Sequence, residues 1–117
     1  MLIGRVSELS GVTRKAIRYY ESIGLINPAP RKGNYRVYND NDVMVITMIR
    51  RAQTLGFSLS ELKEIVLKKA QDKTFPIQVA CDLIDKKMTD LRLEAESLLL
   101  KEQQLNQLKA DLIEEYT

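Results

Sequence analysis

Three cations and two tyrosines fall within seven consecutive residues, Arg14 to Tyr20, of the segment TRKAIRYYESIGLI. Guanidinium and ammonium groups bind anions, and a tyrosine hydroxyl adds a hydrogen-bond donor. Wound as a helix, the segment has two unlike faces. One face carries Arg14, Lys15, Arg18, Tyr19 and Ser22, and the other carries Ala16, Ile17, Tyr20 and Ile23. We therefore predict a helix that packs its apolar face on a core and presents a cationic ridge. For an isolated helix, the simpler interpretation of that ridge is a solvated charged face.

The ends of this helix carry recognisable signals. Thr13 is a good N-cap residue, and Val12 and Ile17 have the spacing of a hydrophobic staple across the first turn. Gly24 supplies the stop, because glycine accepts the left-handed conformation that ends many helices. The ridge is thus expected on a short helix that begins after Thr13.

The elements around the ridge predict a winged helix-turn-helix. A first helix is expected over Ile3–Ser10, ending at Gly11, so that the four residues SGVT join two helices. The prolines and glycine of Asn27–Asn34 exclude a long helix, and YRVY at Tyr35–Tyr38 is typical of a strand with alternating faces. Together these segments predict a β-ribbon beside the two helices.

Two capping sequences predict the next helices. Asn39 with Asp42 opens a third helix that should end at Leu55-Gly56-Phe57. Ser58 with Glu61 has the S-x-x-E pattern of a capping box, which opens a fourth helix through about Lys69. The first seventy residues are therefore expected to be mainly helical.

The second part of the chain changes to a seven-residue period. Apolar residues recur at Ile77, Ile84, Leu91, Leu98, Leu105 and Leu112. The positions four residues later hold Cys81, Met88, Ala95, Glu102, Lys109 and Tyr116, so the seam is interrupted by two charges. A seam of this length without an internal glycine or proline predicts a coiled coil. A helix of about 40 residues is about 60 Å long and could not bury the seam against a seventy-residue domain, so a second chain is expected. The alternative is a helix that folds back on its own domain.

Charge divides the chain in the same place. Residues 1–70 hold twelve Lys and Arg against six Asp and Glu, a net +6, whereas residues 71–117 hold six against ten, a net −4. The first part could meet a polyanion and the second could not readily do so. We expect a winged helix-turn-helix domain at 1–70, a hinge at 71–76 and a dimerisation helix at 77–117.

Several function classes are excluded or disfavoured. The chain has no apolar run long enough to span a membrane and no signal-peptide core, so a cytoplasmic protein is expected. It contains no histidine, no phosphate-cradling glycine loop and no pattern of paired carboxylates, so we expect neither an enzyme nor a cofactor or metal site. The single cysteine, Cys81, lies beside the seam, where a structural role is the simpler interpretation and a thiol sensor or half of an intersubunit metal site is the alternative.

Taken together, three motifs resemble those of the MerR family of bacterial transcription regulators. They are IGRVSELSGVTRKAIRYYESIGLINP at Ile3–Pro28, YRVY with Asp42 after it, and LGFSLSEL at Leu55–Leu62. The resemblance covers nearly the whole chain. It implies an all-α fold with a small β wing, in which an N-terminal winged helix-turn-helix precedes a long helix that forms an antiparallel coiled-coil dimer. The implied dimerisation residues are Ile77, Ile84, Met88, Leu91, Leu98, Leu105 and Leu112.

The resemblance also implies which residues meet DNA. Each helix that begins at Thr13 would enter a major groove of a pseudo-palindromic operator, with the two helices about 34 Å apart. Tyr20 would mainly hold its helix to the domain while its hydroxyl could reach a phosphate, and Lys63 would belong to a second wing. The expected DNA-binding residues are Thr13, Arg14, Lys15, Arg18, Tyr19, Tyr20, Arg31, Lys32, Tyr35, Arg36, Tyr38 and Lys63.

The implied partners are promoter DNA, a second copy of the chain and RNA polymerase, with bending and untwisting of the promoter spacer as the mechanism. Metal-sensing relatives carry a cysteine-bearing loop after the dimerisation helix and drug-sensing relatives carry a ligand domain, and neither is found up to Thr117. The effector is therefore unassigned. The chain could bind no effector, could sense a signal at the junction from Phe75 to Cys81, or could take a hydrophobic ligand between subunits. A coiled-coil module whose winged helix binds a protein partner is the alternative function.

Overall fold

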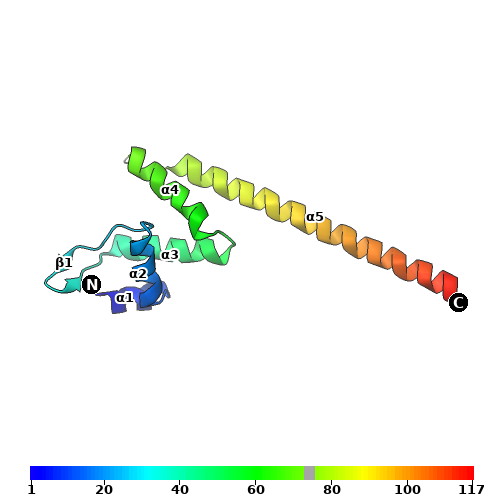
Figure 1. The fold of residues 1–117 in the computed structure, drawn as a ribbon, viewed down its shortest axis with the longest axis horizontal. Coiled ribbons are helices and arrows are strands. Elements are labelled where there is room, and N and C mark those ends of the chain that lie inside the picture. The colour runs from blue at the N-terminus through cyan, green and yellow to red at the C-terminus, as the bar shows by residue number, and fades with distance from the viewer. Residues whose placement is uncertain (73–75) are drawn as a thin grey trace. The chain divides into compact units, whose positions relative to one another are not determined.

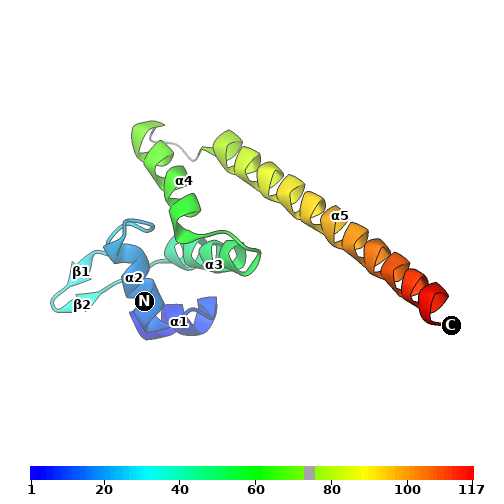
Figure 2. The same cartoon turned by 45° about the vertical axis from the view of Figure 1, so that its right-hand side comes forward.

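The computed structural model describes residues 1–72 and 76–117, and the chain divides into two units, residues 1–76 and residues 77–117. The described part of the first unit contains four helices and one hairpin, which Figures 1 and 2 show as ribbons. In chain order these are α1 (Ile3–Ser10), α2 (Arg14–Ser22), β1 (Arg31–Lys32), β2 (Tyr35–Arg36), α3 (Asp40–Thr54) and α4 (Leu59–Asp72). The second unit is the single helix α5 (Ile77–Tyr116). Among the described residues, no helix is both long enough and apolar enough to cross a membrane.

The core of the first unit lies where α1 packs against α2 and α3. Val6, Ile17 and Ile46, one from each of these helices, are completely buried. Burying such a side chain contributes roughly 1.5–3 kcal/mol to stability. Leu62 of α4 joins the same cluster, so the fourth helix belongs to the domain that carries the cationic helix.

Local capping explains why the helices begin where the sequence predicts. The Asn39 side chain accepts from the Asp42 N–H and the Asp42 carboxylate accepts from the Asn39 N–H, both at 2.9 Å. Ser58 and Glu61 make the same reciprocal pair at 3.0 and 3.1 Å. The predicted cap at Asn39 and the predicted capping box at Ser58 are therefore confirmed, and the Asn39 cap is itself a capping box. Helix α4 extends beyond the predicted end at Lys69, so it includes the first two residues of the predicted 71–76 hinge, and residues 73–75 of that hinge lie outside the described residues.

The second strand of the hairpin, β2, ends two residues before the end of the predicted strand. The antiparallel register of the hairpin pairs Arg31 with Arg36 and Lys32 with Tyr35 around a two-residue turn, in which Gly33 has φ +65°. The expectation of a strand through Tyr38 was wrong. The Val37 N–H still donates to the Pro30 carbonyl oxygen at 2.8 Å, but Pro30 has no N–H to return the bond and the ladder ends.

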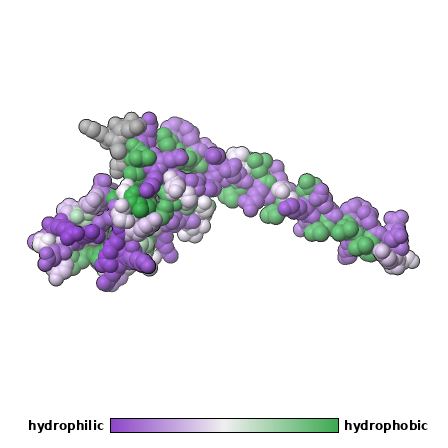
Figure 3. Space-filling view, viewed as in Figure 1, coloured by the Kyte–Doolittle hydropathy of each residue, from purple (hydrophilic) through white to green (hydrophobic). Residues whose placement is uncertain are grey.

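Helix α5 runs for 40 residues without a break, as the seven-residue period predicts. Its seam is exposed in the single chain, with apolar side chains visible along the helix in Figure 3. The exposed fractions are 65% for Ile77, 48% for Ile84, 53% for Met88, 51% for Leu91, 58% for Leu98, 66% for Leu105 and 51% for Leu112. A long apolar stripe of this kind is the surface that a second helix covers in a coiled coil.

Candidate nucleic-acid interface

Helix α2 has the two faces that its sequence predicts. Thr13 is its N-cap, and the Thr13 Oγ1 accepts from the Ala16 N–H at 3.1 Å. Ile17 and Tyr20 are buried, whereas Arg14, Lys15 and Arg18 are exposed. The apolar face therefore anchors the helix, and its cations project from the domain.

The turn between α1 and α2 is fixed by two serine side chains. The Ser7 Oγ donates to the Val12 carbonyl oxygen at 2.6 Å, and the Val12 N–H donates to the Ser10 Oγ at 3.2 Å. Gly11 ends α1 with φ +72°, a left-handed conformation that favours glycine. Because Val12 is itself buried, the crossing of α1 and α2 is held by both hydrogen bonds and packing.

A groove of about 760 Å³ lies between α1, α2 and the hairpin. It is lined by Leu2, Ile3, Gly4, Arg5, Glu8, Arg14, Arg18, Arg31, Asn34, Tyr35 and Arg36. Arg5 pairs with Glu8 at 3.1 Å, and Arg36 pairs with Glu21. Within the described ranges, Arg14, Arg18 and Arg31 have no acidic partner, so the groove retains three uncompensated positive charges. Such a groove attracts a polyanion.

Arg14 reaches the groove by lying directly over α1. A Cβ atom added at Gly4 would come within 2.7 Å of the Arg14 Nη2 and 3.3 Å of its Cζ. The missing side chain at Gly4 is therefore what lets the guanidinium rest on the α1 backbone. This contact orients Arg14 beside the first turn of α1.

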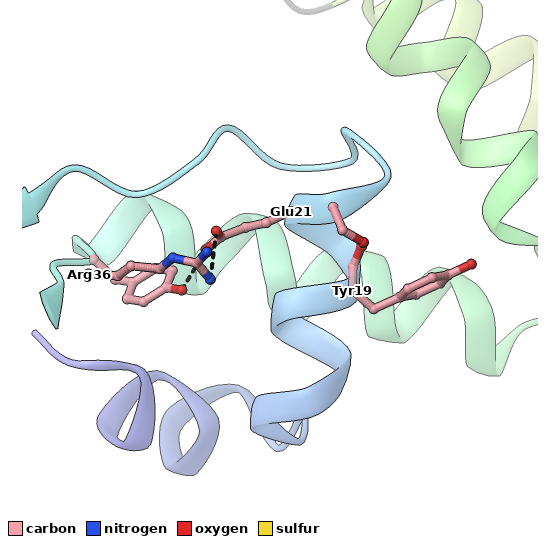
Figure 4. A network of polar contacts seen from close by, with 5 residues as sticks. Tyr19, Glu21 and Arg36 are labelled. Atoms are coloured by element: carbon pink, nitrogen blue, oxygen red, sulfur yellow. Dashed lines mark hydrogen bonds and ion pairs between the residues drawn. The ribbon is translucent and has the colours of Figure 1, made fainter. Parts of the chain in front are cut away.

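The hairpin supplies the wing side of the groove. Arg31 and Tyr35 are exposed, Tyr35 at 67%, and both line the groove. Arg36 is held more tightly, because its Nη1 lies 3.2 Å from the Oε2 of Glu21. Figure 4 shows Arg36 of the hairpin and Glu21 of α2 pointing toward one another. The wing is thus joined to the cationic helix by an ion pair.

The structure corrects the expected position of Tyr38. Its side chain is only 2% exposed, and its hydroxyl donates to the Oε1 of Glu21. Burial, followed by the hydrogen bond and charge of Glu21, raises the pKa of Tyr38 to about 12. Placing this side chain on the wing surface was therefore wrong, because it lies in the core and supports the Glu21 carboxylate.

The two tyrosines of α2 also differ. Tyr20 is 5% exposed and its hydroxyl donates to the Oε1 of Gln53 at 2.7 Å, which agrees with holding the helix to its domain and leaves little surface for a phosphate. Tyr19 is 52% exposed. It points away from Glu21 and Arg36, on the other side of α2 (Figure 4).

The groove brings together only part of the expected set. Arg14, Arg18, Arg31, Tyr35 and Arg36 line it. Thr13, Lys15, Tyr19, Tyr20, Lys32, Tyr38 and Lys63 do not, although Thr13, Lys15, Tyr19, Lys32 and Lys63 are exposed. Whether these residues contact DNA stays a prediction.

Sequence reasoning missed Arg5, Asn34 and Glu21. Glu21 had a detectable signal, since it follows Ile17 by four residues and so falls at the edge of the buried arc of α2. A carboxylate in that position requires a cationic partner from elsewhere in the fold.

Cys81 is exposed on α5. Among the residues that the structure describes, no three His, Cys, Asp or Glu side chains gather as a metal site would require. The structural, thiol-sensing and metal-sharing interpretations of Cys81 are therefore not separated by its geometry.

Two helices joined by a short turn and followed by a β-hairpin define a winged helix-turn-helix domain. The family model described as "MerR HTH family regulatory protein" matches residues 1–69, and the model "MerR, DNA binding" matches residues 43–110. The chain belongs to the MerR family.

Known relatives extend this result. The chain is 55% identical over 67 residues to the HTH-type transcriptional regulator HmrR of Sinorhizobium medicae, which covers 56% of this chain and 46% of HmrR. It thus spans about half the length of the curated relatives it matches. A putative MerR family transcriptional regulator from Listeria monocytogenes superposes with a TM-score of 0.69 at 26% identity, over 91% of this chain and 80% of that one. EcmrR, in a solved EcmrR-DNA complex in EcmrR-RPo, superposes with a TM-score of 0.59 at 26% identity, over 84% of this chain and 34% of that one.

Proposed function

We propose that the chain is a transcription regulator that binds promoter DNA as a homodimer. The first unit binds DNA through the arginine-lined groove, and α5 joins two copies through its seam. The groove carries this proposal, because Arg14, Arg18 and Arg31 present uncompensated charge beside the exposed face of a helix that can enter a major groove. The protein acts by binding and not by catalysis, and a role on chromosomal DNA places it in the cytoplasm.

The dimer sets the form of the operator. An antiparallel coiled coil would relate two copies of α2 by a two-fold axis, so the bound site is a pseudo-palindrome with half-site centres about 34 Å apart. Bending and untwisting the spacer between promoter elements costs on the order of several kcal/mol, which contacts at both ends of the dimer can supply. RNA polymerase is then the second partner at the promoter. The similarity of the chain to EcmrR, which was solved bound to DNA in EcmrR-RPo, supports binding at a promoter. The effector is unassigned.

A binding selection tests the proposal. A random-sequence duplex pool is passed over the full chain, the retained duplex is identified, and its affinity is measured at rising salt. We expect a two-fold-related sequence and a steep loss of affinity with salt, about −0.9 in log–log slope per neutralised phosphate. No retained duplex, or salt-insensitive binding, would favour the alternative in which the winged domain binds a protein.

Arg18→Ala and Arg51→Ala provide a matched pair for the same assay. Both remove one exposed arginine from the first unit, but Arg18 lines the groove and Arg51 lies on α3 outside it. We expect Arg18→Ala to weaken binding by about 1–3 kcal/mol and Arg51→Ala to have a smaller effect. Equal losses in the two variants would remove the groove as the DNA-binding surface.

A further inference from the structure

Glu21 is a nearly buried carboxylate within a domain that carries net positive charge. It lies in the last turn of α2, and its side chain is 5% exposed. Both of its oxygens are occupied: the Oε2 by the Arg36 guanidinium at 3.2 Å and the Oε1 by the Tyr38 hydroxyl. A buried charge is tolerated only with such partners. The group therefore has a defined geometry and not the mobility of a surface glutamate.

This geometry fixes the direction in which Arg36 points. A guanidinium carries five N–H donors in a planar fork, so holding one nitrogen orients the others. Nη1 is held by Glu21, while the side chain as a whole stays 33% exposed and lines the groove with Arg14 and Arg18. The guanidinium also interacts with the Tyr38 hydroxyl. Because the Arg36 side chain is partly exposed and lines the groove, part of its donor fork faces the groove where the hairpin meets α2.

The backbone after the hairpin is fixed at the same place. The Tyr38 N–H donates to the Met1 carbonyl oxygen at 2.7 Å, and the Val37 N–H donates to the Pro30 carbonyl oxygen. The Tyr38 hydroxyl is protonated at neutral pH and donates to Glu21, and its raised pKa keeps it protonated beyond pH 10. Arg36 is therefore held through its side chain, and the two residues that follow it are fixed by backbone hydrogen bonds.

We propose that Glu21 is a positioning residue for DNA binding, which orients the Arg36 fork so that its free N–H groups meet a backbone phosphate of the bound duplex. The proposal rests on the proposed function, since it assumes that the groove receives DNA. It assigns to an acidic residue a favourable role in binding a polyanion.

Charge alone makes the opposite prediction. Replacing Glu21 by glutamine raises the net charge of the first unit, so simple attraction to DNA should increase. If Glu21 acts by orienting Arg36, the same replacement releases the fork and loses a phosphate contact. The sign of the change in affinity therefore separates the two effects.

Glu21→Gln and Glu8→Gln form a matched pair. Glu8 also carries a single negative charge at the groove, but its ion pair with Arg5 is largely solvent-exposed. Affinity for the duplex selected by the wild-type chain is measured by fluorescence titration across a salt series. We expect Glu21→Gln to weaken binding roughly threefold to tenfold and to reduce the salt slope by about 0.9, and Glu8→Gln to leave affinity unchanged or increase it. Unchanged or tighter binding by Glu21→Gln would overturn the proposal.

A double-mutant cycle shows whether Glu21 acts through Arg36. In an Arg36→Ala background, Glu21→Gln should have no further effect on affinity, and additive losses would overturn the proposal. If circular dichroism shows that Glu21→Gln is unfolded, Arg36→Lys replaces it as the test, because lysine keeps the charge and lacks the planar fork. An Arg36→Lys chain that binds as tightly as wild type would overturn the proposal. If the wild-type chain retains no duplex, the proposed function itself fails, which is a different result from a wild-type chain that binds and a Glu21 variant that binds equally well.

Discussion

Alanine at position 4 should stabilise the domain and weaken its binding to DNA. Gly4 is the second residue of α1, so alanine removes at most the entropic disadvantage that glycine has inside a helix, roughly 0.5–1 kcal/mol. For a domain of this size that gain corresponds to a rise of a few degrees in Tm. The new methyl carbon would lie 2.7 Å from the Arg14 Nη2, and the flexible guanidinium must swing away from α1. Stability and DNA affinity should therefore change in opposite directions.

The loss of affinity can be estimated from the contact that Arg14 would make. One arginine contact to DNA is worth about 1–3 kcal/mol, so we expect at least about a fivefold weaker complex, and a salt slope smaller by about 0.9 if the contact is to a phosphate. Fluorescence titration of the selected duplex measures the affinity, and thermal unfolding measures the stability. In an Arg14→Ala background, Gly4→Ala should still raise Tm but leave affinity unchanged. A Gly4→Ala chain that binds as tightly as wild type would refute the role of this close contact.

Two further predictions concern the seam and the buried tyrosine. Leu98→Glu should convert the dimer to a monomer, as measured by sedimentation. Leu100 is similarly exposed in the single chain but lies about 200° around the helix from Leu98, so Leu100→Glu should leave the chain dimeric. A dimeric Leu98→Glu chain would show that the seam is not the dimer interface. Because the pKa of Tyr38 is raised from 10.0 to about 12, its contribution to stability is complete below pH 10 and is lost as the pH rises through about 12. The free energy of unfolding should therefore fall more steeply over this range for wild type than for Tyr38→Phe, and parallel curves would contradict the assignment.

The helices could be predicted because their signals are local. Asn39 and Asp42 are three residues apart, and their reciprocal hydrogen bonds need nothing from the rest of the fold. The period of α5 is likewise a property of consecutive residues. The ridge of α2 was predictable for the same reason, since one helical turn determines which side chains share a face.

The wing could be predicted only in part, because its end depends on a distant residue. The alternation of YRVY suggested a strand through Tyr38, but the strand partner of Val37 is Pro30, which cannot donate to the ladder. Tyr38 therefore leaves the sheet and enters the core. The pattern gave the correct place for the hairpin and the wrong surface for its last tyrosine.

Glu21 escaped prediction because its partners come from another element. Arg36 and Tyr38 follow it by fifteen and seventeen residues, and no local period relates them. A helical wheel can show that a carboxylate approaches the buried face, but only the fold selects which cation meets it. A carboxylate near the buried face of a helix therefore indicates that a partner exists, but the sequence does not identify that partner.

The charges of the groove give a reason for the dimer that does not depend on the shape of the operator. If Arg14, Arg18, Arg31 and Arg36 each neutralise one phosphate, the salt slope is about −3.6 for one protomer and about −7.2 for two. Doubling the salt would then weaken binding of a monomer roughly twelvefold and of a dimer roughly 150-fold. The ratio of the salt slopes of wild type and Leu98→Glu therefore gives the number of protomers that bind the DNA together. Because one groove contributes so few charges, the coupling of two through α5 is what raises binding above the non-specific affinity of any basic domain.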